Sequence, residues 1–433
     1  MWGALIFALA PVAYASVEIP VRFANQDWLV NLTVGSDPDN SSQFEVIFDT
    51  GQTELILNSA SCEFCKVGGW DETGFTANIS ASPALSINQG YGANATVGNV
   101  AFASMGSSVA GEQLWVADAI YNTGNASEPP PSNNPYELDD GILGAAELAS
   151  SFCDAVSRNN TCVPSSLFLA LLRSADDATG DAAAFSVYFP PFEPMGVSAG
   201  VAGTLTLGPR DGAFEASSGP PAVRVPRADE VDAVRALLDA GTGTFADGKW
   251  CFLADDVLVN GASTGACALG ADNNTLGKCL VFTDTGSPRT SVPPTLLTAE
   301  QQDAWTDWVA DNSHGLPFPQ TYCDEMSGAP LNISISVGGL LLSLTPPDTA
   351  VYISTNSAGR DLCIAQLAVA DFASGFDDPT NPAYALPAPI IFAGNNWLRN
   401  FYVTHTPQTD DAAASMTLGC AVESRTTVGC AAV

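Results

Sequence analysis

The residues with the clearest chemical potential form the tripeptide Asp-Thr-Gly, which occurs twice, at residues 49–51 and 284–286. Glycine lets the backbone turn tightly after the acid and lets another segment approach closely. Threonine adds a hydroxyl that can fix the loop by hydrogen bonds. If the two loops face each other, Asp49 and Asp284 come close enough to share a proton. One carboxyl can then act as base toward a water while the other acts as acid toward a carbonyl.

Each tripeptide stands in a similar context, so the chain repeats a pattern. Apolar residues precede both copies, at 44–48 (FEVIF) and 280–283 (LVFT). Far downstream, each half carries a short apolar run that ends in a glycine, Gly144 in the first and Gly394 in the second. Two similar halves that each present one aspartate at a strand end predict a two-fold arrangement.

The elements that must position these aspartates are predicted to be strands. Short β-branched and aromatic runs alternate with Gly, Asn and Pro, which is typical of a β-rich protein. We expect strands at 28–34, 44–48, 185–189, 204–207, 251–259 and 333–337. Helical patterns are few, and they lie at 164–174, 230–240 and 294–310. Polar, proline-rich stretches at 122–135 and 376–387 predict surface loops.

Composition and charge exclude several classes of function. The 433 residues include 47 acidic and 14 basic side chains, a formal net charge of −33, with only three lysines, Lys66, Lys249 and Lys278. The length allows two or three domains, and 46% hydrophobic residues exclude a disordered acidic chain. A strongly anionic surface repels phosphate, which argues against nucleic acid and anionic lipid as partners. Repulsion among the carboxylates would ease as the pH falls toward their pKa values, which favours an acidic environment.

The N-terminus predicts export. Residues 1–15 (MWGALIFALAPVAYA) are apolar and end in an Ala-x-Ala cleavage signal, which indicates a signal peptide; the alternative is a buried N-terminal segment. No later apolar run is long enough to predict a membrane span. We expect a secreted, extracellular protein, with the vacuole as the alternative location. Eight glycosylation sequons support this expectation: Asn31, Asn40, Asn78, Asn94, Asn125, Asn159, Asn273 and Asn332.

Cysteine and histidine usage argues against a metal site. Cys62 and Cys65 form a Cys-x2-Cys motif, which could be a small disulfide or half of a metal site. The chain has no second such motif, and His314 and His405 are its only histidines. We therefore expect no metal and no cofactor. Both histidines are expected on the surface or in loops, because neither belongs to a recognisable catalytic pattern.

The 11 cysteines are expected to form structural disulfides, because a thiol nucleophile would need a histidine partner. Cys153 and Cys162 bracket a polar loop and could pair locally. An odd number leaves one cysteine unpaired or paired between chains. The pattern predicts no partner for five of them: Cys251, Cys267, Cys279, Cys420 and Cys430.

Together these segments resemble the pepsin-like aspartic peptidases of the secreted, fungal type, over nearly the whole chain after residue 15. The resemblance rests on FEVIFDTGQTELILNS and LVFTDTGSPRTSVPP as active-site segments, DDGILG and IIFAGNNWLRNFYV as their supports, and YGANATVG as a flap. FSVYF, GTLTLG and KWCFLADDVLVNG resemble strands where the halves meet, and TYC, ISISVGGLLLSLTPPDTAVYIS and LCIA resemble late strands. The family implies an all-β, bilobal fold: two pseudo-two-fold related β lobes with a cleft between them and few short helices. The expected lobes are residues 16–202 and 203–433.

The resemblance also implies a role for each matching residue. Asp49 and Asp284 would be the catalytic pair. The supporting roles would be Thr50 and Thr285 as a lock between the halves, Gly51 and Gly286 as backbone groups that bind substrate, Ser287 as a hydrogen-bond partner of Asp284, and Tyr91 as the flap residue that closes over substrate. A disulfide between Cys323 and Cys363 is implied as well.

The implied function is a secreted aspartic endopeptidase that hydrolyses proteins at acidic pH through a water activated between the two aspartates. We expect a monomer without a cofactor that binds extended peptides by strand-like hydrogen bonds. The alternative is a catalytically weak or inactive pepsin-like protein that acts as a binding module, because Gln52, Ile56, Asn94 and Pro288 depart from the family pattern. A glycosidase also uses two carboxylates. The Thr-Gly after each aspartate and the two-fold repeat disfavour that function.

Overall fold

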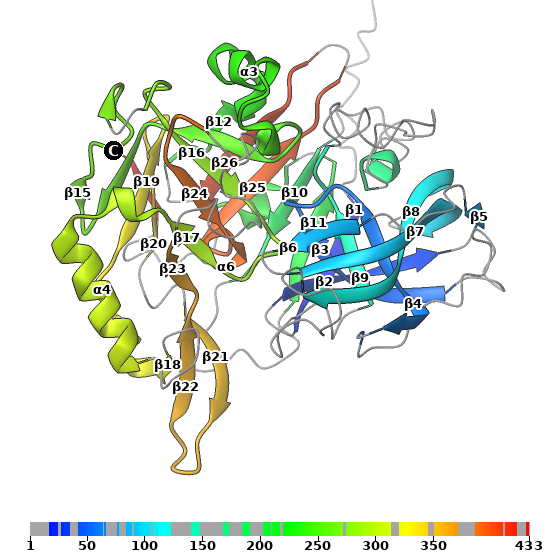
Figure 1. Cartoon of the computed structure of the whole chain (residues 1–433), viewed down its shortest axis with the longest axis horizontal. Helices are drawn as coiled ribbons and strands as arrows, with labels where there is room; N and C mark the ends of the chain where they lie inside the picture. Colours follow the sequence, from blue (N-terminus) through cyan, green and yellow to red (C-terminus); the bar gives the residue numbers. More distant parts are fainter. Residues whose placement is uncertain are drawn as a thin grey trace, which may run out of the picture.

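The computed structural model of the chain describes residues 17–24, 27–34, 42–63, 65, 76–77, 84–88, 91–104, 107–122, 140–147, 168–172, 184–190, 202–208, 210–216, 220–271, 274–312, 320–344, 350–370, 386–409, 412–421 and 430–432. Between residues 76 and 122 the description covers the backbone alone. Strand makes up 47% of the structure, and helices are few and short. The expected mainly-β class is therefore confirmed. In Figure 1, strands from the first part of the chain (blue to cyan) gather on one side and strands from the later part (green to orange) on the other.

The largest sheet has 14 strands among the described residues. Its order is β12-β26-β25-β10-β11-β1-β2-β3-β9-β4-β8-β7-β5, with β6 paired to β7. These strands are β1 (Val17–Ala24), β2 (Asp27–Val34), β3 (Ser42–Asp49), β4 (Leu55–Glu63), β5 (Thr76–Ala77), β6 (Ala84–Asn88), β7 (Tyr91–Ser104), β8 (Ser107–Asn122), β9 (Gly141–Gly144), β10 (Phe185–Tyr188), β11 (Ala202–Leu207), β12 (Val223–Pro226), β25 (Phe401–Thr406) and β26 (Ser415–Cys420).

Three smaller sheets contain the remaining described strands. One sheet has the order β13-β16-β24-β17-β23, the next β15-β14-β19-β20-β27, and the smallest β18-β22-β21. Their bounds are β13 (Cys251–Ala254), β14 (Asp256–Val259), β15 (Ala262–Ser263), β16 (Cys279–Thr283), β17 (Thr290–Val292), β18 (Gln320–Tyr322), β19 (Ile333–Val337), β20 (Leu340–Leu344), β21 (Ala350–Thr355), β22 (Asp361–Ala365), β23 (Leu367–Val369), β24 (Ile390–Ala393) and β27 (Cys430–Ala432).

All six predicted strands are present, and one of them is divided. The run at 251–259 forms β13 and β14, because Asp255 stands at a bend between them. The two pieces join different sheets: β13 pairs with β16, and β14 pairs with β19. The two apolar parts of this run, on either side of Asp255 and Asp256, therefore belong to two sheets.

The helices lie close to the predicted positions. They are η3 (Gly212–Phe214), η4 (Ala228–Glu230), α3 (Asp232–Asp239), η5 (Thr244–Ala246), η7 (Pro294–Leu296), α4 (Ala299–Asn312), η8 (Cys323–Gly328) and α6 (Asn395–Leu398). Residues 168–172, inside a third predicted helix, are helical too. A capping box starts α4: Gln301 N–H donates to Thr298 Oγ1 at 3.2 Å, and Thr298 N–H donates to Gln301 Oε1 at 2.9 Å.

The predicted repeat is visible in the strand pairing. In the first half, β3 runs parallel to β9, β9 antiparallel to β4, and β4 parallel to β8. In the second half, β16 runs parallel to β24, β24 antiparallel to β17, and β17 parallel to β23. The same three pairings therefore surround each Asp-Thr-Gly segment.

Strands from both parts of the chain meet in the large sheet. Strand β10 pairs with β11 on one side and with β25 on the other, and β11 pairs with β1. Figure 1 shows β10, β11 and β25 between the two groups of strands. The expected boundary between residues 202 and 203 falls at the start of β11, so the division into two lobes stays a prediction.

An aromatic cluster lies under the sheet junction. Phe185 in β10 packs edge-on against Phe48 and Trp250, with ring centroids 6.0 Å and 5.6 Å away. His405 stacks on Phe185 at 4.5 Å and is 1% exposed. The expectation of a surface or loop position for His405 is therefore wrong. His405 lies in β25 opposite Phe185, so its ring points into the core. The other histidine, His314, lies outside the described residues.

Four disulfides occur among the described residues. The predicted pairs Cys62–Cys65 and Cys323–Cys363 are both present. Two further pairs, Cys267–Cys279 and Cys420–Cys430, join cysteines for which the sequence predicts no partner. Cys251 is a buried free thiol. Cys153 and Cys162 lie outside the described residues, as does the segment 1–15.

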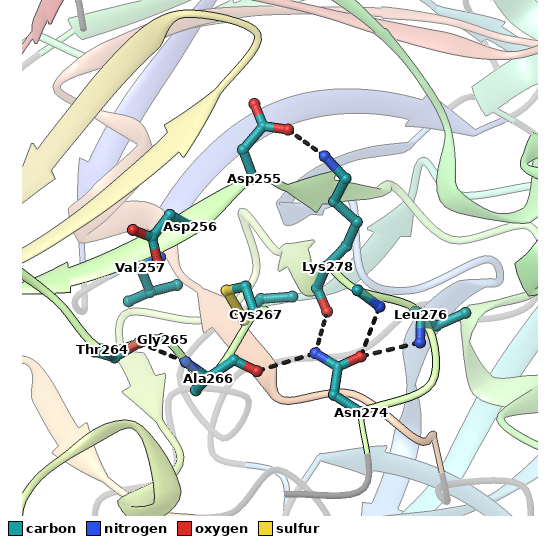
Figure 2. Close-up of a disulfide and its surroundings, with 12 residues drawn as sticks. Asp255, Asp256, Val257, Thr264, Gly265, Ala266, Cys267, Asn274, Leu276 and Lys278 are labelled. Atoms are coloured by element: carbon teal, nitrogen blue, oxygen red, sulfur yellow. Dashed lines mark hydrogen bonds and ion pairs between the residues drawn. A yellow bond between two sulfur atoms is a disulfide. The ribbon is translucent and has the colours of Figure 1, made fainter. Parts of the chain in front are cut away.

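Asn274 organises the loop that the Cys267–Cys279 disulfide closes (Figure 2). Its amide donates to the carbonyls of Ala266 at 3.0 Å and Lys278 at 2.9 Å, and its carbonyl accepts the N–H of Leu276 at 3.0 Å. At the rim of this loop, Lys278 forms an ion pair with an exposed aspartate, Asp255.

Two sequons among the described side chains, Asn31 and Asn332, are exposed. Within the described ranges, no helix combines the length and apolar character needed to cross a membrane.

Candidate active site

Each aspartate of the two tripeptides is held where a parallel strand pair ends. Asp49 is the last residue of β3 and lies opposite Gly144 of β9. Its carbonyl accepts the N–H of Ala145 at 2.8 Å. Asp284 directly follows β16, and its N–H donates to Ala393 of β24 at 2.9 Å. We call residues 49–52 the first aspartate loop and residues 284–287 the second aspartate loop.

Two threonines join these loops by four hydrogen bonds. The N–H of Thr50 donates to Oγ1 of Thr285 at 3.0 Å, and the N–H of Thr285 donates to Oγ1 of Thr50 at 3.0 Å. The Thr50 hydroxyl donates to the carbonyl of Thr283 at 3.2 Å, and the Thr285 hydroxyl donates to the carbonyl of Phe48 at 2.6 Å. Both threonines are fully buried. This reciprocal set, the threonine lock, fixes the two loops face to face.

The lock brings the two carboxyls into a hydrogen bond with each other. Asp49 is buried, while Asp284 keeps part of its surface exposed. Oδ1 of Asp49 also accepts N–H groups from Gly51 at 2.7 Å and Gln52 at 3.1 Å, whereas Oδ1 of Asp284 accepts one from Gly286 at 2.9 Å. We call Asp49 and Asp284 the aspartate pair.

Burial raises the pKa of both members of the aspartate pair. The pKa of Asp284 is raised further by the charge of Asp49 and by the hydrogen bond between them, so it lies well above its ordinary value. The same hydrogen bond and the two backbone N–H groups favour the charged form of Asp49. The pair therefore shares one proton.

The glycines of the two tripeptides are required by close packing. A Cβ atom on Gly51 would lie 2.6 Å from Cγ of Asp284, and one on Gly286 would lie 2.3 Å from Cγ of Asp49. Both distances are far below van der Waals contact. Each loop therefore presents a bare backbone to the carboxyl of the other loop, and a side chain at either glycine would push the pair apart.

The two downstream glycines, Gly144 and Gly394, are also required by close packing, against the backbone that follows each aspartate loop. A Cβ on Gly144 would lie 2.5 Å from the backbone carbon of Thr53, and one on Gly394 would lie 1.9 Å from the carbonyl oxygen of Arg289. Thr53 and Arg289 each follow an aspartate loop. The repeated apolar-apolar-glycine pattern therefore marks the strands that support these loops.

Lys249 is a site residue that no sequence motif predicts. Its ammonium donates to the carbonyl of Gly51 at 2.9 Å, from the opposite half of the chain. Its charge lowers the pKa of both Asp49 and Asp284, against the larger effect of burial. The available signals were its rarity, as one of three lysines in the chain, and its place before Trp250.

Two side chains of the aspartate loops, the departing Gln52 and the predicted support residue Ser287, contact residues other than the aspartate pair. The side-chain amide of Gln52 donates to a carboxylate oxygen of Glu54. The Ser287 hydroxyl accepts the N–H of Arg289 at 3.4 Å. A hydrogen bond from Ser287 to the second aspartate therefore stays a prediction.

The backbone of the predicted flap is described, but its side chains are not. Tyr91 is the first residue of β7, where it lies opposite Asn88 of β6 and Asn122 of β8. Two residues separate β6 from β7, and these strands are antiparallel. The side chains of Tyr91 and Asn94 lie outside the described residues. Ile56, in β4, is buried.

The described side chains include no cluster of three or more His, Cys, Asp or Glu that could hold a metal ion. No family model matches the chain, and no curated protein matches it significantly.

Proposed function

We propose that this protein is a secreted aspartic endopeptidase that hydrolyses peptide bonds in proteins at acidic pH. The observation that carries the proposal is the aspartate pair: two carboxyls from opposite halves of the chain, hydrogen-bonded to each other between loops that the threonine lock holds together. Aspartates that only stabilise turns do not need a second carboxyl from another loop, held in place by the threonine lock. A proton shared by two carboxyls supplies an acid and a base at one point.

In the proposed reaction a water molecule between the carboxyls attacks the carbonyl carbon of the scissile peptide bond. Ionised Asp49 takes a proton from this water while Asp284 gives its proton to the carbonyl oxygen. The tetrahedral intermediate then carries two hydroxyls. When the C–N bond breaks, Asp49 passes its proton to the nitrogen and Asp284 regains one from a hydroxyl. The products are an acid and an amine, and the starting pair is restored.

This mechanism requires the singly protonated pair, which exists only between the two macroscopic pKa values of the coupled carboxyls. Because burial raises both pKa values, the second proton leaves Asp284 well above the ordinary carboxyl range. Asp49 must lose its proton before it can act as a base. These two limits bound the active range: below the lower one Asp49 holds a proton, and above the upper one Asp284 has lost its proton.

The repeated strand pairing around the two loops supports a bilobal, pepsin-like fold with an extended peptide bound between the lobes. Strand addition would supply main-chain hydrogen bonds to such a substrate. The antiparallel β6 and β7, with Tyr91 next to their connection, would be the flap. We further propose that the protein acts as a monomer and needs no cofactor. Four disulfides are typical of proteins from oxidising compartments, which supports export.

The first test is digestion of denatured haemoglobin or casein at about pH 3–4, with and without a statine-type inhibitor. Asp49→Asn and Asp284→Asn should each lower kcat by on the order of 10³-fold or more, because neither variant can place one proton on two carboxyls. Both variants should keep the wild-type melting temperature within a few degrees.

Asp324→Asn is the matched control, because it removes the same charge from a side chain that is 67% exposed and paired with Arg360. This variant should retain wild-type activity. Substantial turnover by either site variant would contradict the paired-carboxyl mechanism. Absence of cleavage by the wild type between about pH 2 and 6 would instead favour the binding module.

A further inference from the structure

Lys249 places a positive charge beside the aspartate pair, and the proposed mechanism does not use it. Its ammonium holds the carbonyl of Gly51, and the N–H of the same glycine donates to Asp49. We propose that Lys249 is a positioning residue that fixes the first aspartate loop and sets the acidic limb of the pH–activity profile. The kinetic part of this inference rests on the proposed peptidase function.

The backbone around Lys249 is well supported. Lys249 lies in the turn between η5 and β13. Its N–H donates to the carbonyl of Ala246 at 3.3 Å, and its carbonyl accepts the N–H of Cys251 at 2.8 Å. The next residue, Trp250, is fully buried, and its indole N–H donates to the carbonyl of Ala145 at 2.9 Å. Ala145 in turn donates to the carbonyl of Asp49. The turn is therefore anchored to the strand end that carries the first aspartate.

Other charged groups near this turn are engaged elsewhere. Arg227 forms ion pairs with Asp229 at 2.7 Å and with Glu147 at 2.6 Å. Asp247 lies close to this cluster, and burial raises its pKa. Lys249 therefore differs from Arg227: its ammonium is directed at the aspartate loop instead of at a neighbouring carboxylate.

The direction of the effect follows from charge. A cation near two carboxyls stabilises their ionised forms, which lowers the pKa of each. Removing the cation would raise the pH at which Asp49 loses its proton. The acidic limb of kcat/KM reports that first deprotonation of the free enzyme. Without Lys249 the limb should move to higher pH.

Three variants separate this role from a structural one. Lys249→Met removes the charge and the donor but keeps an unbranched chain, whereas Lys249→Arg keeps both charge and donors. Lys278→Met removes the same charge from a side chain that is 41% exposed and paired with Asp255 (Figure 2), so it controls for net charge. The measurement is kcat/KM for a peptide substrate as a function of pH.

For Lys249→Met the acidic limb should shift upward by on the order of 0.5 to 1 pH unit, which lowers kcat/KM on that limb by about 3- to 10-fold. Lys249→Arg should restore the wild-type limb, and Lys278→Met should leave it in place. An unchanged limb in Lys249→Met overturns the inference. A uniform fall at all pH values, or an equal shift in Lys278→Met, overturns it as well.

A second measurement does not depend on turnover. Titration of the aspartate carboxyls by 13C NMR should show both transitions of the pair at higher pH in Lys249→Met than in the wild type. Unchanged transitions would overturn the inference even if the enzyme is active. If the wild type cleaves nothing, the proposed function fails, while this titration still decides whether Lys249 acts on the pair.

Discussion

Among individual residues, the aspartate pair is asymmetric although its two loops share the sequence Asp-Thr-Gly. Asp49 accepts two backbone N–H groups and the hydrogen bond from Asp284, whereas Asp284 accepts one backbone N–H. Donors directed at a carboxylate favour its charged form. The negative charge therefore resides on Asp49 and the proton on Asp284. This assignment makes Asp49 the base in the proposed reaction.

His405 is a second residue whose chemistry depends on burial. Burial lowers the pKa of His405 to about 3 from its ordinary value of 6.5, so the ring is neutral in the folded protein. In the unfolded chain the imidazole takes up a proton as the pH falls below 6.5, whereas in the folded protein it stays neutral until about pH 3. Stability is therefore lost between about pH 6.5 and 3, by up to about 5 kcal/mol.

We predict that His405→Leu stabilises the protein more at acidic than at neutral pH, because leucine removes this protonation of the unfolded state. The gain in the free energy of unfolding of the variant over wild type should be about 3 kcal/mol larger at pH 4 than at pH 7. Urea unfolding at the two pH values measures the difference. An equal change at both pH values would show that the ring titrates normally in the folded protein.

On the scale of elements, the threonine lock connects two sets of strands that have the same pairing scheme. Each loop emerges from one parallel pair, β3 with β9 or β16 with β24, and the lock crosses between them. Because the four hydrogen bonds are buried, the loss of one partner leaves the other polar group with no hydrogen bond, since water cannot reach it. The geometry of the aspartate pair is thus determined by strand ends and their mutual bonds.

Thr50→Val tests the lock, because valine has nearly the shape of threonine but no hydroxyl. The change leaves the buried N–H of Thr285 and the carbonyl of Thr283 without their partner. We expect a loss of about 1–3 kcal/mol in the free energy of unfolding, together with a lower kcat. Denaturant unfolding and steady-state kinetics give the two values.

Thr206→Val is the matched control for this prediction. Thr206 lies in β11 and is fully buried, and its hydroxyl has no hydrogen-bond partner among the described residues. Replacing it should leave stability unchanged or raise it, with activity retained. If Thr206→Val costs as much as Thr50→Val, the loss reflects core packing instead of the lock.

For the whole molecule, net charge and buried carboxyls act in the same direction. The charge of −33 at pH 7 favours expansion by self-repulsion, which weakens as carboxylates are neutralised. Burial raises the pKa of Asp140 and of Asp247, as it does for the aspartate pair. A carboxyl with a raised folded pKa contributes stability that is present at low pH and is lost as the pH rises through that pKa. His405 opposes this trend below pH 6.5.

We therefore predict that the melting temperature is highest at about pH 3–5 and falls toward neutrality, because the net charge and the four carboxyls with raised pKa values together outweigh the single His405. Differential scanning calorimetry across the pH range measures the profile. Added salt should reduce the fall, because it screens repulsion between surface charges. A melting temperature that rises steadily from about pH 4 to 8 would contradict the prediction.

The local features of this protein could be predicted from its sequence: the strands, the repeated Asp-Thr-Gly segments and the distal glycines at 144 and 394. These features are readable because backbone torsions and the alternation of apolar residues are local properties. The sequence places Asp255 and Asp256 in the middle of the run at 251–259, but that its two parts join different sheets depends on partners far away in the chain.

Which distant groups become neighbours depends on the folded chain. Lys249 and Gly51 are 198 residues apart, and their contact depends on how the turn before β13 packs against the first aspartate loop. The burial of His405 against Phe185 likewise follows from the pairing of β10 with β25. The disulfide between Cys267 and Cys279 closes the loop that Asn274 organises. Sequence motifs identify the groups that can do chemistry. Their pKa values and partners follow from contacts that the whole chain must fold to make.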